Sequence, residues 1–118
     1  MDGVGGDVGR YTVADDPMWT LVMFDLPVGT AAQRRRATRF RNMLLDLGFS
    51  MVQYSVYVRY VPTGAPTPPI VRQIKENVPP DGLVRVIYIT DRQWSRMLNF
   101  WGSTQVNPEP APQQLQFF

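Results

Sequence analysis

The sequence predicts an α+β domain whose elements follow the order β, α, β, β, α, β. Three observations carry this prediction: apolar segments of strand length at 19–24 and 83–90, an amphipathic segment between residues 30 and 47, and an alternating segment at 49–61. This order is the split βαβ pattern of the ferredoxin-like fold, an antiparallel sheet with both helices on one face. A chain of 118 residues is long enough for one such domain.

The first strand and the first helix have recognisable ends. Residues 19–24 read WTLVMF, and this apolarity indicates a central strand that is covered on both faces. Asp25 and Pro27 end the strand, Thr30 offers an N-cap, and Gln33 completes a capping box. Apolar residues at helical spacing and a terminal glycine then define the helix: Ala37, Phe40, Leu44, Leu47 and Gly48.

The segment 49–61 alternates with a period of two but is long for one strand, so we expect a break or bulge near Gln53. The proline-rich segment 62–69 predicts a loop, and apolar residues at 70–78 predict a short second helix. Residues 83–90 predict the fourth strand of the sheet.

The parts outside this core are less regular. Residues 1–17 are rich in glycine and aspartate and are expected to form a disordered leader, with the ferredoxin-like domain at 18–101. Asp91 is a candidate N-cap for a helical turn at 91–97, and the aromatic segment 97–101 predicts a last strand or a docking segment. Residues 102–118 predict a flexible tail rich in proline and glutamine, with a binding motif at its end.

The apolar groups on the second face of the sheet need a cover, and a second copy of the chain would supply it, so we expect a homodimer. Trp94, Phe100 and Trp101 are then expected in a core or subunit interface rather than as platforms for stacked bases, because Met97 and Leu98 surround them.

Positive charge is concentrated in one part of the chain. Residues 30–60 carry six arginines and one aspartate, a pattern that indicates either a polyanion partner or a solvated helix face. Guanidinium groups bind phosphate oxygens without requiring a given base. The candidate nucleic-acid ligands are Arg34, Arg35, Arg36, Arg39, Arg41 and Arg59. Of these, Arg34, Arg35 and Arg39 are the best placed, whereas Arg36 sits nearer the core side.

Composition limits the chemistry. The chain has no cysteine and no histidine, which excludes disulfides, thiolate metal sites and the commonest general base. Any catalysis must therefore use carboxylates, hydroxyls, arginines or a hard metal ion. No apolar segment reaches the roughly 18 residues of a membrane span, so no membrane contact and a cytoplasmic location are expected.

Several motifs occur in order at a characteristic spacing. They are MFDLP at 23–27, FRNMLL at 40–45 followed by GF at 48–49, VQYSVYVR at 52–59 and GLVRVIYITD at 82–91. Together they resemble the family of CRISPR-associated protein 2 over residues 19–101.

This resemblance implies a homodimer placed between two dimers of CRISPR-associated protein 1, the integrase. In that assembly the small subunit contacts double-stranded DNA (the prespacer) and sets the spacing between the catalytic sites. The resemblance also implies a metal-dependent endonuclease acting on single-stranded RNA or double-stranded DNA. Asp25 would then be the catalytic residue and the metal ligand, with Mg²⁺ shared by two copies of Asp25 across the dimer.

Two function classes therefore stay open. One is a DNA-organising scaffold of spacer integration, favoured by the arginine-rich helix. The other is a free metal-dependent nuclease, favoured mainly by Asp25, although an acidic residue that ends a strand before a turn is common in loops. An unrelated ferredoxin-like RNA-binding module is a distant third, because the strands lack the aromatic, basic motif that such modules use for stacking.

The C-terminal motif is a separate hypothesis. Leu115, Phe117 and Phe118 follow a proline-rich spacer and could add to a partner as an extended segment. CRISPR-associated protein 1 is the expected partner. The string QLQFF also looks like the peptides that dock on the bacterial sliding clamp, and a disordered end is the third alternative.

Overall fold

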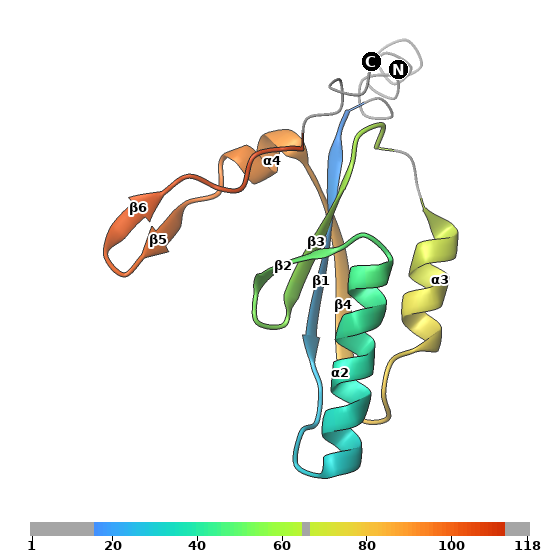
Figure 1. The fold of residues 1–118 in the computed structure, drawn as a ribbon. Helices are drawn as coiled ribbons and strands as arrows, with labels where there is room; N and C mark the ends of the chain where they lie inside the picture. Colours follow the sequence, from blue (N-terminus) through green and yellow to red (C-terminus); the bar gives the residue numbers. More distant parts are fainter. Residues whose placement is uncertain (1–15, 65–66, 113–118) are drawn as a thin grey trace, which may run out of the picture. The chain divides into compact units, whose positions relative to one another are not determined.

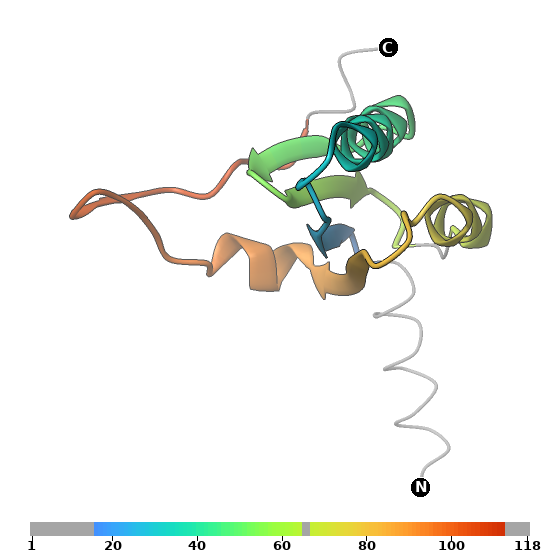
Figure 2. The same cartoon turned by 90° about the horizontal axis from the view of Figure 1, so that it is seen from below.

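The computed structural model describes residues 16–64 and 67–112 (Figure 1). A four-stranded sheet has the order β2-β3-β1-β4, and helices α2 and α3 lie on one face of it (Figures 1 and 2). This is the predicted ferredoxin-like arrangement. By internal contacts the described chain divides into two compact units, one at 20–59 and 67–88, and the other at 16–19, 60–64 and 89–112.

Strand β1 (Met18–Asp25) and helix α2 (Ala31–Asp46) supply most of the core of the first unit. Val22 and Phe24 face the helix, and the rings of Phe24 and Phe40 meet edge to face with centroids 5.2 Å apart. The predicted capping box is confirmed: Gln33 N donates to Thr30 Oγ1 at 3.1 Å, and Thr30 N donates to Gln33 Oε1 at 2.9 Å.

Strands β2 (Ser50–Gln53) and β3 (Val56–Val61) form the hairpin expected from the long alternating segment. They pair antiparallel, and the register shifts between Met51 and Gln53, which confirms the predicted break. The connecting turn contains Ser55 at a φ of 86°, an unusual value for a residue other than glycine. The Ser55 carbonyl accepts a hydrogen bond from Phe24 N at 3.0 Å, so the turn is tied to the end of β1.

Helix α3 (Pro68–Glu76) begins inside the segment that we expected to be a loop. That expectation was wrong for its last two residues, because Pro68 and Pro69 occupy the first helical turn. Proline is tolerated there, since the first amide groups of a helix have no intrahelical acceptor. Strand β4 (Leu83–Thr90) follows as predicted.

The second unit contains the short helix α4 (Asp91–Ser95). Its N-cap is Thr90 and not Asp91, because the Thr90 hydroxyl accepts from Gln93 N at 3.0 Å and Gln93 Oε1 accepts from Thr90 N at 2.8 Å. Asp91 instead accepts from Trp19 Nε1 at 2.7 Å. Trp94 is 2 % exposed and its ring stacks on Trp19 at 4.2 Å, which confirms the expected core role of Trp94.

The chain continues into a second, two-stranded sheet. Strand β5 (Asn99–Trp101) pairs antiparallel with β6 (Thr104–Val106). The predicted last strand is thus present, and its partner β6 lies inside the segment that the sequence assigns to the tail. No helix within the described residues is long and apolar enough to cross a membrane.

Candidate nucleic-acid interface

Three of the predicted arginines lie together on the outer side of α2. Arg34, Arg35 and Arg39 are exposed, and we call them the arginine face. Their spacing of one, four and five residues places them on adjacent stripes of the helix. With Ala31, Thr38 and Asn42 they line an open hollow of about 570 Å³. Guanidinium, hydroxyl and amide groups therefore line the hollow together.

The N-terminal end of this surface is fixed by hydrogen bonds. Arg34 Nη1 donates to the Val28 carbonyl at 3.2 Å, which ties the side chain to the loop before α2. A guanidinium group has five N–H donors, so this bond leaves others free for a phosphate group. The capping box at Thr30 holds the first turn of the same helix.

The structure places the other three predicted arginines elsewhere. Arg36 is half-buried and lines a separate pocket of about 240 Å³ together with Glu76, as its position near the core side suggested. Arg59 is half-buried on the helix side of β3. Its side chain lies close to Gly48, just after α2, since a methyl group added at Gly48 would be 3.5 Å from Arg59 Nε. Arg59 therefore does not belong to the exposed group formed by Arg34, Arg35 and Arg39.

Arg41 is held by aromatic rings. Its Cζ atom lies 5.4 Å from the ring centroid of Phe24 and 4.4 Å from that of Tyr54. These are cation–π distances. Its Nε atom is buried without a hydrogen-bond partner. The contacts come from β1 and from the β2–β3 turn, so the helical pattern alone could not reveal them. Tyr54 was not among the predicted site residues.

Asp25 ends β1 and is exposed. Because Val22 and Phe24 face the helices, Asp25 and Met23 belong to the opposite, open face of the sheet. There they line a pocket of about 280 Å³ with Leu83 and Arg85. A cationic side chain, Arg85, thus lines the same pocket as the Asp25 carboxylate.

The fit of Mg²⁺ to Asp25 depends on a second chain. Magnesium prefers octahedral oxygen coordination and keeps several waters, so one carboxylate alone is a poor site. Among the described residues no three acidic, histidine or cysteine side chains gather closely enough to hold a metal. The described part of a single chain therefore does not suit Mg²⁺, and the expected site would need Asp25 from a second copy.

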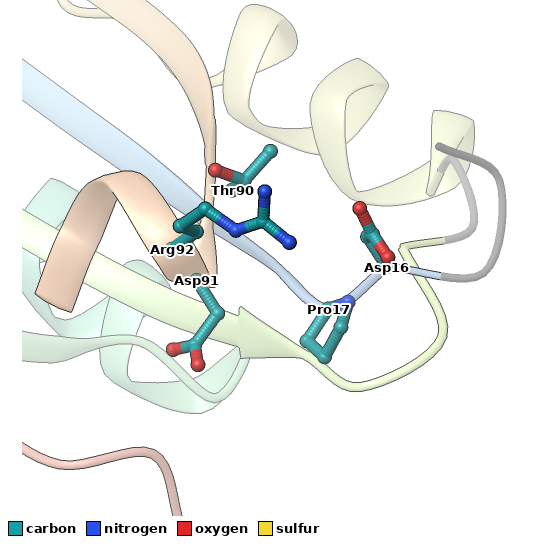
Figure 3. Close-up of a pocket in the computed structure, with 5 residues that line it drawn as sticks. All are labelled: Asp16, Pro17, Thr90, Asp91 and Arg92. Atoms are coloured by element: carbon teal, nitrogen blue, oxygen red, sulfur yellow. The ribbon is translucent and has the colours of Figure 1, made fainter. Parts of the chain in front are cut away.

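A further pocket of about 270 Å³ lies in the second unit (Figure 3). Asp16, Pro17, Thr90, Asp91 and Arg92 line it. Asp91 is already bonded to Trp19. Burial raises the pKa of the nearby Tyr60, and the charge of Asp91 raises that pKa further. These contacts give Asp91 a structural role. The predicted tail contacts Leu115, Phe117 and Phe118 lie outside the described residues.

Comparisons with known proteins agree on one family. The family model described as "CRISPR associated protein Cas2" matches residues 18–97. A CRISPR-associated endoribonuclease Cas2 of Paracidovorax avenae is 44% identical over 101 residues, covering 86% of this chain and 94% of the relative. One of Flavobacterium psychrophilum is 39% identical over 101 residues, covering 86% and 88%. The crystal structure of Streptococcus pyogenes Cas2 aligns with a TM-score of 0.54 at 21% identity, covering 71% of this chain and 99% of that one.

Proposed function

This chain belongs to the family of CRISPR associated protein Cas2, and we propose that it acts as a dimeric, nucleic-acid-binding scaffold of spacer integration. In this role it positions double-stranded DNA, the prespacer, for CRISPR-associated protein 1, which carries out the integration chemistry. The observation that carries the proposal is the arginine face, three exposed guanidinium groups around one open hollow. Such groups bind the phosphate backbone of any sequence, as a scaffold for varied prespacers requires.

The homodimer is part of this proposal. Leu83 and Ile87 are exposed on β4, and Leu83 lies on the sheet face opposite the helices. In the β5–β6 hairpin, Phe100 is 60% exposed and Trp101 is 82% exposed. Large apolar side chains in such number are typical of an interface, and a second copy would remove them from water. Light scattering on the purified chain should give the mass of a dimer, and Trp101→Ser combined with Leu83→Ser should shift it toward the monomer.

The proposed contact with CRISPR-associated protein 1 uses the tail residues Leu115, Phe117 and Phe118. An extended apolar segment after a proline-rich spacer can add to a partner's surface at little steric cost. Pull-down of CRISPR-associated protein 1 and of the sliding clamp, with and without the last six residues, separates the two partners. If the full chain and the truncated chain recover each partner equally, the tail binds neither CRISPR-associated protein 1 nor the sliding clamp.

An integration assay with CRISPR-associated protein 1 tests the scaffold. We expect Asp25→Ala to retain integration, whereas the triple variant Arg34→Gln, Arg35→Gln, Arg39→Gln loses most of it. Circular dichroism serves as the folding control for both variants. Loss of integration in Asp25→Ala with normal activity in the triple variant would contradict the scaffold proposal.

A second candidate function is a metal-dependent endonuclease on single-stranded RNA or double-stranded DNA. The names of the relatives, which call those proteins endoribonucleases, favour it, as does the exposed position of Asp25. When bound, Mg²⁺ would supply charge for a phosphodiester group, and Asp25 from each subunit would hold it. We expect weak hydrolysis that chelation and Asp25→Ala both abolish. Unchanged nuclease activity in purified Asp25→Ala would assign the cleavage to another site or to a contaminant.

A further inference from the structure

The turn between β2 and β3 presents an exposed aromatic ring on a rigid support. Tyr54 is 73% exposed, although its ring lies over the guanidinium group of Arg41 at 4.4 Å. With one face covered by Arg41, this exposure leaves the rest of the ring open to solvent. An exposed ring fixed in this way differs from a freely rotating surface side chain, because its orientation is already set.

The support extends into the core. Arg41 also contacts Phe24 at 5.4 Å, and Phe24 in turn packs on Phe40 and Tyr57. Phe24 is buried, so the series from Phe24 through Arg41 to Tyr54 begins in the core and ends at the surface. The buried Nε atom of Arg41 has no hydrogen-bond partner. Ring contacts therefore hold this guanidinium.

The backbone of the turn is fixed as well. Ser55 adopts a φ of 86°, a conformation that costs free energy for a residue with a side chain. Its carbonyl accepts a hydrogen bond from Phe24 N at 3.0 Å. Residues held in such conformations are enriched at ligand sites, where the strain fixes a side chain in position.

We propose that Tyr54 is a stacking platform for one unpaired nucleobase of a nucleic acid bound on the arginine face. A tyrosine ring is a π-surface that any base can cover, and the guanidinium beneath it adds favourable charge. Arg41 and Arg34 are seven residues apart on one side of α2, which corresponds to about 10 Å along the helix axis. This distance equals roughly three base steps of 3.4 Å. The ligand class is thus a strand with an unpaired end or loop, in DNA or RNA.

This inference rests on the proposed nucleic-acid binding and adds a preference for unpaired bases. The test measures the affinity of wild type, Tyr54→Phe, Tyr54→Leu and Tyr54→Ala for three ligands: a single-stranded DNA, a single-stranded RNA and a blunt DNA duplex. We expect Tyr54→Leu and Tyr54→Ala to weaken the binding of both single strands by about 5- to 150-fold, because one stacked base is lost. Tyr54→Phe keeps the ring and should stay within about twofold of wild type, as should all variants on the blunt duplex.

Three further measurements separate stacking from a structural role. A 4-thiouridine or 5-iodouracil strand should crosslink to Tyr54 in the wild type, and mass spectrometry identifies the residue. The matched control is Tyr88→Ala, which removes another exposed tyrosine, on β4, and should leave single-strand affinity within about twofold. Light scattering on every variant checks that the oligomeric state is unchanged.

Several results would overturn the inference. They are unchanged single-strand affinity in Tyr54→Ala, full affinity in Tyr54→Leu, equal losses on the blunt duplex, or a change of oligomeric state with normal single-strand binding. The last result would assign Tyr54 to a protein interface. Failure of the proposed function looks different, because the wild type would then bind neither the duplex nor the single strands.

Discussion

Replacing Arg35 by glutamine removes one positive charge from the centre of the arginine face. Arg35 is exposed and lines the open hollow beside Arg39 and Thr38. Glutamine has nearly the helix propensity of arginine, so α2 should stay intact. The substitution therefore changes the number of phosphate contacts while the fold and the neighbouring side chains are kept.

The magnitude follows from counterion release. Each phosphate neutralised on duplex DNA contributes about 0.9 to the slope of log affinity against log salt. Over a fourfold rise in salt, from about 50 to 200 mM, one such contact corresponds to about 3.5-fold in affinity. If both subunits of the dimer touch one duplex, Arg35→Gln lowers the slope by about 1.8. The ratio of the affinity at about 50 mM salt to that at about 200 mM salt then becomes about 12-fold smaller than in the wild type.

Fluorescence anisotropy across this salt range, on two duplexes of unrelated sequence, measures the slope. We expect equal losses on both duplexes, since a backbone contact carries no sequence information. Arg72→Gln, at an exposed position of α3, is the control with the same change in net charge. The reasoning fails if Arg35→Gln alters sequence preference at constant slope, or if Arg72→Gln lowers the slope equally.

Three stability predictions follow from local geometry. Thr30→Ala removes the capping acceptor and should lower the free energy of unfolding by about 1 kcal/mol, whereas Thr30→Ser retains it; urea denaturation measures both. Gly82→Ala should lower the free energy of unfolding by about 1–3 kcal/mol in the same assay, because the new methyl group would lie 2.7 Å from Leu26 Cδ2. An unchanged urea midpoint would contradict this prediction. Burial, and then the charge of Asp91, raise the pKa of Tyr60, so this side chain should ionise at a lower pH in the unfolded chain than in the folded chain. The free energy of unfolding should therefore fall above a pH of about 10, and Tyr60→Phe should reduce that fall.

Local chemistry explains what the sequence could predict. The capping box at Thr30 and the break near Gln53 were predicted because each depends on residues close in sequence. The cap of α4 was assigned wrongly to Asp91, although Thr90 and Gln93 repeat the spacing of Thr30 and Gln33. Strand-like neighbours made Thr90 look like part of β4 only, whereas it is both the last strand residue and the N-cap.

The candidate site, too, was only partly predictable from the sequence. Helical periodicity was enough to place Arg34, Arg35 and Arg39 on one exposed surface. It could not place Arg41, because the rings that hold it come from residues 24 and 54, at the ends of other strands. Contacts between segments far apart in sequence depend on how the strands pair, and no local pattern encodes them.

The two proposed activities use opposite sides of the sheet. Helix α2 covers the face that carries Val22 and Phe24, and the arginine face points outward from this helix, whereas Asp25 belongs to the open face. A phosphate backbone held by the arginines is therefore not presented to Asp25 of the same subunit. A second copy on the open face would bring two Asp25 carboxylates into one interface and leave both arginine faces outside. Because the scaffold would bind DNA through the outer surface and the nuclease would use the Asp25 carboxylates at the interface, Arg35→Gln should weaken DNA binding, whereas Asp25→Ala should abolish hydrolysis without weakening DNA binding.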